Sequence, residues 1–344
     1  MANVKRGRKK LGKNVAITVI LVIVLFLGTI LAPEINDDGT VESTLQNENT
    51  AQSPNDVLES TQSGKKDDNP SIQVDGELIL TMVDVGQADG FILEHSEKVV
   101  VIDCGTRSTG KNMVKQLQEK GITKIDYLFG THPHDDHMGG MLTILNNFEI
   151  GKVIIPEAEG ITSDWYNNLI NTLAEGDYEI EFSKKGNTYQ FGDVKITVLE
   201  QMENPVKNTN NYSAIMKITY GEMDIIMTGD AETEVEEILL ESGQDISAEI
   251  LKIGHHGSDT STSEKFLDAV DPLYALISCS VGNRYKHPTE ETMNKLQTRN
   301  VEVYRTDESG TIVLTITATD VTFNCEPGDY LSGPELEKKE GKSW

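Results

Sequence analysis

The pattern of apolar and polar positions divides the chain into distinct parts. Residues 15–32 form an uncharged apolar run, residues 33–75 are polar and acidic with few large apolar side chains, and from residue 76 short apolar segments alternate with amphipathic ones. A helix of about 20 apolar residues crosses a bilayer, so the first run predicts a transmembrane helix. The polar segment cannot bury enough surface to offset its ordering entropy, so it predicts a disordered linker. A folded domain is predicted over residues 76–326, followed by a loose polar tail over residues 327–344.

Within the folded domain, two kinds of pattern alternate. Runs rich in β-branched and aromatic residues, bounded by Gly, Pro or polar residues, predict strands, and amphipathic segments predict helices. The predicted strands span residues 77–85, 98–104, 124–131, 151–156, 178–183, 194–200, 212–220, 223–229, 248–254, 273–279, 300–305 and 311–317. The predicted helices span residues 110–120, 138–147, 163–175, 231–242, 262–270 and 289–298. This order favours the α/β (α+β) class, with two sheets covered by helices on their outer faces.

Charge is distributed unevenly along the chain. Six Lys and Arg side chains lie in residues 1–14, directly before the apolar run. The positive-inside rule places this basic segment in the cytoplasm, so that residues 15–32 act as an uncleaved signal-anchor in the cell membrane and the folded domain is extracellular. A cleavable signal peptide is the alternative, although its apolar core is usually shorter, about 7–15 residues. Without the six cations, the formal net charge of −26 becomes −32 for the rest of the chain, which argues against a general nucleic-acid binder.

Three of the seven histidines lie within the segment THPHDDHMGG, residues 131–140. The segment connects a predicted strand to a predicted helix, which allows its side chains to converge on one place. In an extended loop His132 and His134 point to the same side, and Asp136 and His137 then face a second point nearby. Imidazole and carboxylate groups without thiolates suit zinc, manganese or iron. The spacing therefore predicts two adjacent positions for divalent metal ions, Zn²⁺ or Mn²⁺.

The pattern H-x-H-x-D-H after a strand resembles the signature of the metallo-β-lactamase superfamily of hydrolases. The resemblance implies a four-layer αββα sandwich, and it extends to three further motifs. In VVVIDCG, Asp103 would support a metal ligand without touching the metal itself. In IIMTGDAE, Asp230 would bridge the two metal ions. In LKIGHHGSDTS, a histidine would bind the second metal ion, with His255 favoured over His256.

Three further phrases resemble the extracellular hydrolase domain of ComEC-type competence proteins. They are MVDVGQADG, HHGS and NRYKHPTEETMNKL, and the similarity covers about residues 76–318. The first phrase departs mildly from the usual pattern at Ala88. Asp84 and Ser258 could flank the site, although Asp84 could equally form a turn. His287 could bind a substrate phosphate or protonate the leaving group, or it could be an ordinary loop residue.

One usual ligand of the superfamily is absent. No histidine lies between positions 137 and 230, where most members carry another metal ligand. The segment NTNNYSAIMKI, residues 208–218, stands there instead and resembles a polar motif of the ComEC-type branch. Asn210, Asn211 and Ser213 are its candidates to stand in for the absent histidine, as a metal ligand or as a donor to a substrate oxygen. Asn211 is the favoured one, although it could also be a neutral residue at the entry of a strand. The first metal position would then be completed by water or by an asparagine, which would suit Mn²⁺.

These resemblances imply a hydrolase in which two divalent ions share and activate a water molecule. Asp136 would orient that water as well as bind metal. The leading hypothesis is a membrane-anchored phosphodiesterase acting on DNA or on a cell-envelope polymer, with no obligate protein partner. A β-lactamase-like activity or an ester hydrolase is an alternative, as is a non-catalytic envelope module that metal stabilises.

Overall fold

The structure is a computed structural model that describes residues 74–202, 208–339 and 341. All of these residues lie in one unit of the chain, Asp68–Trp344. The basic segment, the transmembrane helix and all but the last two residues of the linker, as predicted from the sequence, fall outside the described residues. Among the described helices, none is both long and apolar enough to cross a bilayer.

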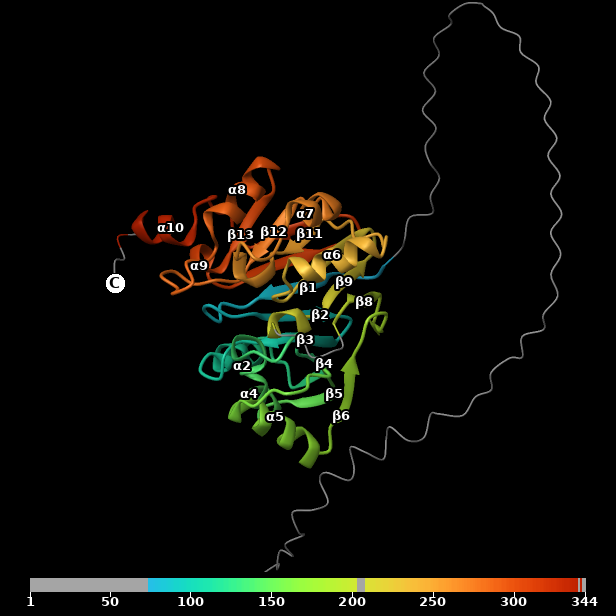
Figure 1. Cartoon of the computed structure of the whole chain (residues 1–344). Helices are drawn as coiled ribbons and strands as arrows, with labels where there is room; N and C mark the ends of the chain where they lie inside the picture. The colour runs from blue at the N-terminus through green and yellow to red at the C-terminus, as the bar shows by residue number, and fades with distance from the viewer. Residues whose placement is uncertain (1–73, 203–207, 340, 342–344) are drawn as a thin grey trace, which may run out of the picture. The chain divides into compact units, whose positions relative to one another are not determined.

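Two sheets form the centre of the domain (Figure 1). The first sheet has the strand order β15-β14-β1-β2-β3-β4-β5-β6, and the second has the order β13-β12-β11-β10-β9-β8-β7. The strands of the first sheet are β1 Leu78–Met82, β2 Gly90–His95, β3 Lys98–Cys104, β4 Lys124–Phe129, β5 Glu149–Pro156, β6 Glu179–Ser183, β14 Ile312–Ile316 and β15 Val321–Phe323. Those of the second are β7 Thr188–Phe191, β8 Val194–Glu200, β9 Ile215–Tyr220, β10 Met223–Met227, β11 Ile250–Lys252, β12 Tyr274–Ile277 and β13 Glu302–Arg305.

Parallel pairing decides where the functional loops lie. Strands β3 to β6 run parallel to one another, and so do strands β10 to β13. The carboxyl ends of parallel strands meet at one edge of a sheet, so the loops that follow them gather there. The rows of buried Val, Ile and Leu in these strands fit this arrangement, because a parallel strand is covered on both faces.

Helices cover the outer faces of the two sheets (Figure 1). They are α2 Gly110–Glu119, α3 Asp135–Met138, α4 Met141–Leu145, α5 Asp164–Glu175, α6 Thr233–Glu241, α7 Glu264–Val270, α8 Glu290–Thr298, α9 Thr306–Ser309 and α10 Gly333–Lys339, with 3₁₀ turns η1 Thr209–Tyr212 and η2 Gly254–Gly257. One buried apolar cluster joins the two sheets and includes Leu80 and Met216. A second lies under α2, α4 and α5, and a third under α6, α7 and α8. The layers therefore follow the order helix, sheet, sheet, helix, because each sheet buries both of its faces.

Three strands were not predicted from the sequence, namely β2, β7 and β15. Strand β2 begins at a glycine, and β7 and β15 are only four and three residues long, so their periodicity is too short to be recognised.

The helix predicted over residues 138–147 is two short helices, α3 and α4, separated by Gly139 and Gly140. A Cβ atom on Gly140 would lie 2.1 Å from the carbonyl oxygen of Cys104. Glycine therefore allows the chain after the histidine cluster to press directly against the end of β3. This contact brings Asp103 and the cluster close together.

The segment predicted to be a loose tail, residues 327–344, contains helix α10. Leu336 on this helix is buried, and the backbone N–H of Gly333 donates to the carbonyl of Pro288 at 2.8 Å. The guanidinium of the buried Arg305 also donates to the carbonyl of Leu331. Buried contacts of this kind have no periodic signal in a short polar segment, so the sequence did not reveal them.

Candidate metal centre

The loops that follow the parallel strands bring the predicted site residues to one place. Asp103 comes from the end of β3, and the histidine cluster follows β4. Asp230 follows β10, and His256 follows β11. Residues far apart in the chain thus meet at the shared carboxyl edge of the two sheets, which is where ligand sites form in sheets of this kind.

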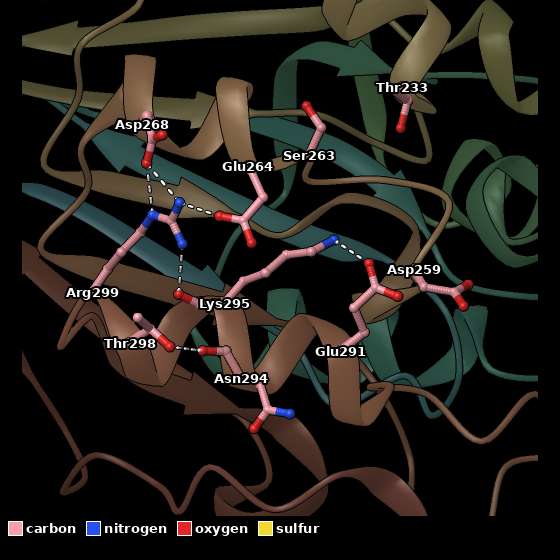
Figure 2. Close-up of a pocket in the computed structure, with 10 residues that line it drawn as sticks. All are labelled: Thr233, Asp259, Ser263, Glu264, Asp268, Glu291, Asn294, Lys295, Thr298 and Arg299. Carbon is pink, nitrogen blue, oxygen red and sulfur yellow. Dashed lines mark hydrogen bonds and ion pairs between the residues drawn. The ribbon is translucent and has the colours of Figure 1, made fainter.

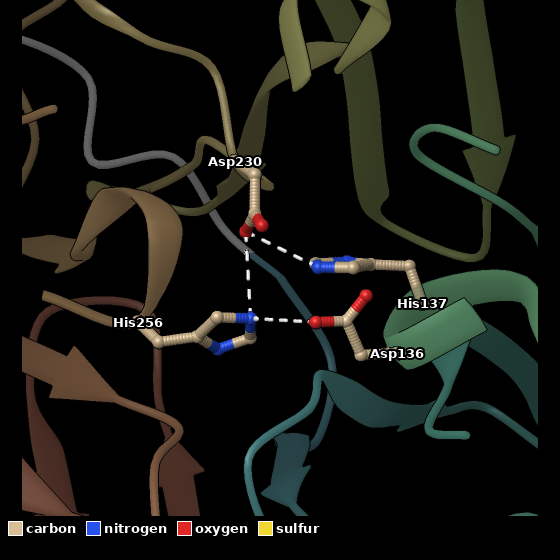
Figure 3. Close-up of side chains that lie close together, drawn as sticks. All are labelled: Asp136, His137, Asp230 and His256. Atoms are coloured by element: carbon tan, nitrogen blue, oxygen red, sulfur yellow. Dashed lines mark ion pairs between the residues drawn. The ribbon is translucent and has the colours of Figure 1, made fainter. Parts of the chain in front are cut away.

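The first group of potential metal ligands consists of Asp136, His137, Asp230 and His256 (Figure 3). His137 Nε2 lies 3.2 Å from Asp230 Oδ1, and His256 Nε2 lies 3.7 Å from both Asp230 Oδ1 and Asp136 Oδ2. His137 Nε2, His256 Nε2 and Asp230 Oδ1 are buried and have no hydrogen-bond partner. Buried polar atoms almost always form hydrogen bonds, so three ligand atoms that form none and that face one another at one point fit a bound cation.

The second group consists of His132, His134 and Asp230. His132 Nε2 lies 3.0 Å from His134 Nδ1 and 3.9 Å from Asp230 Oδ2. The hydroxyl of the buried Ser213 accepts from the backbone N–H of Asp230 at 3.0 Å and lies 3.1 Å from His132 Nδ1. Ser213 therefore holds two ligand residues of this group in place. Because Asp230 belongs to both groups through its two oxygens, its position suits a bridge between two metal ions.

The histidine favoured from the sequence, His255, belongs to neither group. Both His255 and His256 have left-handed backbone angles, with φ values of 50° and 56°. This turn directs the His256 ring inward, where Nδ1 donates to the carbonyl of Ser278 at 2.8 Å and leaves Nε2 free. His255 Nε2 lies 3.7 Å from Asp230 Oδ2, and its Nδ1 lies 3.2 Å from the hydroxyl of Thr260. Of the two histidines, His256 therefore belongs to a group of potential metal ligands, and the ligand role expected for His255 stays a prediction.

Asp103 lies directly behind His137. Its Oδ2 accepts from His137 Nδ1 at 2.7 Å and from the hydroxyl of Thr131 at 2.7 Å, while Oδ1 accepts from the backbone N–H of Thr131 at 2.9 Å. The φ angle of Asp103 is 56°, a conformation that costs non-glycine residues about 1–3 kcal/mol. The hydrogen bond fixes the ring of His137 with Nε2 directed at the cluster.

Asp89 is a site residue that the sequence reading missed. It is the second aspartate of the phrase MVDVGQADG, whereas only the first, Asp84, was considered. Asp89 Oδ2 lies 2.9 Å from Lys252 Nζ, and Asp89 Oδ1 lies 3.4 Å from His256 Nδ1. Both members of this pair are buried, with exposed side-chain fractions of 1% and 0%. The phrase itself was the signal that could have identified Asp89.

Four carboxylates, Asp89, Asp103, Asp136 and Asp230, surround the imidazoles of the cluster. Although burial opposes it, the charges of Asp230 and Asp89 raise the pKa of His256 to about 10. Burial likewise opposes a rise at His137, but Asp230 and Asp103 hold its pKa well above the ordinary value. A raised pKa means that the surrounding carboxylates favour a positive charge on the imidazole. A metal ion bound to an imidazole nitrogen would supply such a charge in place of the proton.

An open cavity of about 350 Å³ gives access to the cluster. Its lining is formed by His134, Asp135, Asp136, Asn210, Asp230, His255, His256, Tyr285 and His287. Tyr285 is 49% exposed at this cavity, and the guanidinium of Arg284 lies 4.7 Å from the centre of its ring. The cavity thus combines the acidic cluster with an exposed aromatic ring and a neighbouring cation.

His287 also faces this cavity. Its ring stacks on Tyr285 with 5.7 Å between the ring centres, and its buried Nδ1 has no hydrogen-bond partner. Burial, together with His255 and His256, lowers the pKa of His287 to about 4. The imidazole is therefore neutral near pH 7, which suits a hydrogen-bond acceptor better than a proton donor.

The remaining predicted residues lie further from the cluster. Asp84 is exposed, and its Oδ1 accepts from the backbone N–H of Gly86 at 3.1 Å, so it forms a turn. Ser258 contacts the hydroxyl of Thr260 at 3.1 Å, and Thr260 in turn contacts His255. Asn211 uses both its amide nitrogen and its amide oxygen in hydrogen bonds to Glu234 and Glu232 at the start of α6.

A second cavity lies between α7 and α8, and its cationic groups are already paired (Figure 2). Arg299 binds both Asp268 and Glu264, and Lys295 lies 2.9 Å from Glu291. Because acidic side chains neutralise these two cations, this cavity offers no unpaired cation to an anionic substrate.

Comparisons with known proteins agree with this geometry. The Metallo-beta-lactamase superfamily model matches residues 83–281. ComE operon protein 3 of Bacillus subtilis is 32% identical over 262 residues, which cover 71% of this chain and 33% of that protein. Competence protein ComA of Neisseria gonorrhoeae is 27% identical over 245 residues, which cover 71% of this chain and 33% of that protein. The solved structure of the metallo-beta-lactamase fold protein YhfI from Bacillus subtilis is 13% identical, with a TM-score of 0.49, and the match covers 70% of this chain and 100% of that one.

The chain spans about a third of the length of these curated relatives. Their names confirm the resemblance to ComEC-type competence proteins that three phrases of the sequence indicated. The superfamily match covers more than half of the chain and includes the histidine cluster, Asp230 and His256. This chain therefore belongs to the metallo-beta-lactamase superfamily.

Proposed function

We propose that this protein is a metal-dependent phosphodiesterase, anchored in the cell membrane with its hydrolase domain outside the cell. The observation that carries the proposal is the convergence of three buried ligand atoms without hydrogen bonds, on His137, His256 and Asp230, beside an open cavity. When bound, two divalent ions such as Zn²⁺ or Mn²⁺ would supply Lewis acidity, which activates water and offsets negative charge on substrate oxygens. The substrate would be a phosphodiester of DNA or of a cell-envelope polymer.

The charge of the site supports an anionic substrate. The cluster holds four carboxylates, and the buried cation Lys252 pairs with one of them, Asp89. Two divalent ions together with Lys252 would exceed these carboxylates by one positive charge. A phosphodiester carries one negative charge, so it would neutralise the loaded site despite the acidic surface of the domain.

The residues divide the work of binding and orientation. His132 and His134 would hold one ion, His137 and His256 the other, and Asp230 would contact both. Asp136 lies at the cavity and is half-buried, so its free oxygen could orient the attacking water. The exposed ring of Tyr285 and the neighbouring charge of Arg284 could contact the part of the substrate beyond the reacting phosphate.

Metal analysis and a chromogenic phosphodiester test this proposal. We expect the full chain, purified in detergent, to bind two divalent ions and to hydrolyse bis-p-nitrophenyl phosphate. Chelation should abolish turnover, and Mn²⁺ or Zn²⁺ should restore it. Absorbance of released nitrophenolate measures the rate, and elemental analysis counts the ions. One bound ion without turnover would favour a metal-stabilised module, and turnover of a β-lactam or a simple ester alone would favour a different hydrolase.

The membrane anchor has its own test. Because six cations precede the apolar run of residues 15–32, we expect the domain after it to be exported. Protease added to intact cells should therefore digest the domain, and an antibody against its C-terminus should lose its signal. A cytoplasmic protein serves as the control for cell integrity. Protection of the domain in intact cells, with digestion only after lysis, would reverse the proposed orientation.

A further inference from the structure

One buried amide group at the metal centre has a free oxygen. Asn210 is only 8% exposed, lines the cavity, and its Oδ1 has no hydrogen-bond partner. Burying an amide oxygen without a hydrogen-bond partner destabilises the fold by about 1–3 kcal/mol. A ligand bound to this oxygen would remove that cost. Asn210 occupies the part of the chain where no histidine is present, between the histidine cluster and Asp230.

The orientation of the Asn210 amide follows from its partner. Its Nδ2 donates to Glu232 Oε1 at 2.9 Å. A carboxylate only accepts hydrogen bonds, so the nitrogen must face Glu232 and the oxygen must face the other way. The backbone N–H of Asn210 also donates to Asn208 Oδ1 at 3.1 Å, and its carbonyl accepts from Ser213 at 2.9 Å. The oxygen is therefore held in one direction by a fixed turn.

The neighbouring Asn211, which the sequence favoured, cannot play this part. Its Nδ2 donates to Glu234 at 2.9 Å, and its Oδ1 accepts from the backbone N–H of Glu232 at 3.2 Å. Both ends of this amide are thus used to hold the start of α6. The free amide oxygen belongs to the preceding residue.

We propose that Asn210 Oδ1 is the ligand that completes the metal position of His132, His134 and Asp230, in place of a third imidazole. This inference rests on the proposed two-metal site. An amide oxygen is a neutral, hard donor, which suits an ion that accepts oxygen ligands, such as Mn²⁺, better than one that prefers nitrogen. Asn210 thus sets the preference of this position for Mn²⁺ over Zn²⁺ without changing the charge of the site.

Direct titration of metal into the chelator-stripped full chain tests the assignment. We expect wild type to bind two Mn²⁺ ions, and Asn210→Ala to lose about 10–100-fold in affinity for one of them while the other is unchanged. Competition with a chromophoric chelator gives the affinities, and the electron paramagnetic resonance signal of Mn²⁺ reports coupling between the two ions. That coupling should disappear in the variant at an ion concentration that saturates only one position.

Two further variants separate a metal ligand from a structural role. Asn210→Asp keeps the oxygen but loses the donor to Glu232, so it should retain Mn²⁺ binding, whereas a merely structural residue would fail in both variants. Asn211→Ala is the matched control and should leave both affinities unchanged. Thermal unfolding of the stripped proteins shows whether each variant still folds.

The outcomes distinguish the two proposals. Two bound Mn²⁺ ions with equal affinities in wild type and Asn210→Ala would overturn the role of Asn210 and leave the metal centre intact. Equal loss in the Ala and Asp variants would also overturn it, because the contact with Glu232 would then explain the effect. Loss in His255→Ala, together with an unchanged Asn210→Ala, would assign the ligand to His255 instead. Absence of metal binding in wild type would refute the proposed function itself.

Discussion

Asp230→Asn should reduce hydrolysis of bis-p-nitrophenyl phosphate by about 1,000-fold or more, equivalent to about 4 kcal/mol in the activation barrier. Asp230 Oδ1 lies beside His137 Nε2, and Oδ2 lies on the side of His132. An amide has the same shape but offers one neutral oxygen, so it cannot contact two cations with negative charge. The number of bound ions should fall from two to one at most, measured by elemental analysis alongside the rate.

Asp224→Asn provides the control for this variant. Asp224 lies on β10, the strand that leads to Asp230, but it belongs to neither group of potential metal ligands. Its Oδ2 lies 2.8 Å from Lys217 Nζ. Its replacement should leave the rate and the metal content close to those of wild type. Near-normal turnover by Asp230→Asn with two ions bound would show that this carboxylate is not the bridge.

Lys252→Met should destabilise the fold by about 3–5 kcal/mol, because it leaves the buried charge of Asp89 without its partner. Lys252 Nζ lies 2.9 Å from Asp89 Oδ2 and donates to the carbonyl of Ile253 at 2.9 Å. Urea unfolding in the presence of a chelator measures the free energy of unfolding without a contribution from metal. Lys98→Met removes a largely exposed partner of Asp126, and we expect it to cost less than about 1 kcal/mol.

The effect of Lys252→Met should depend on pH in a defined direction. Burial opposes ionisation of Asp89, but Lys252 and His256 lower its pKa to about 2, below its ordinary value of 3.8. A lowered pKa in the folded state stabilises the protein above about pH 4, and this stabilisation is lost as the pH falls towards 2. In Lys252→Met, protonation of Asp89 removes its unpaired negative charge. The difference in free energy of unfolding between this variant and wild type should therefore become smaller in acid.

A double variant decides whether the pair explains the loss. Asp89→Asn combined with Lys252→Met removes both charges, so it should recover a large part of the stability lost by Lys252→Met alone. If the double variant were as unstable as the sum of the two single variants, the loss would come from packing. The charge pair would then not be the cause.

The sequence determined the features that depend on local spacing. His132, His134, Asp136 and His137 share one loop, so their spacing alone predicted two neighbouring ligand groups, and the structure places them in two groups. The phrases that resembled ComEC-type proteins likewise identified the superfamily correctly. The alternation of strand and helix patterns predicted two sheets with outer helices, because the periodicity of apolar residues is a property of neighbouring positions in the sequence.

Tertiary structure alone decided which of two adjacent residues faces the site. His256 rather than His255 belongs to a group of potential metal ligands because its left-handed backbone turn directs the ring inward. Asn210 rather than Asn211 has a free amide oxygen because the start of α6 binds the amide of Asn211. The pair of Asp89 and Lys252 joins the turn before β2 to strand β11, which no local pattern connects. Spacing in the sequence limits which side chains share a loop, but backbone angles and partners from distant strands decide where each side chain points.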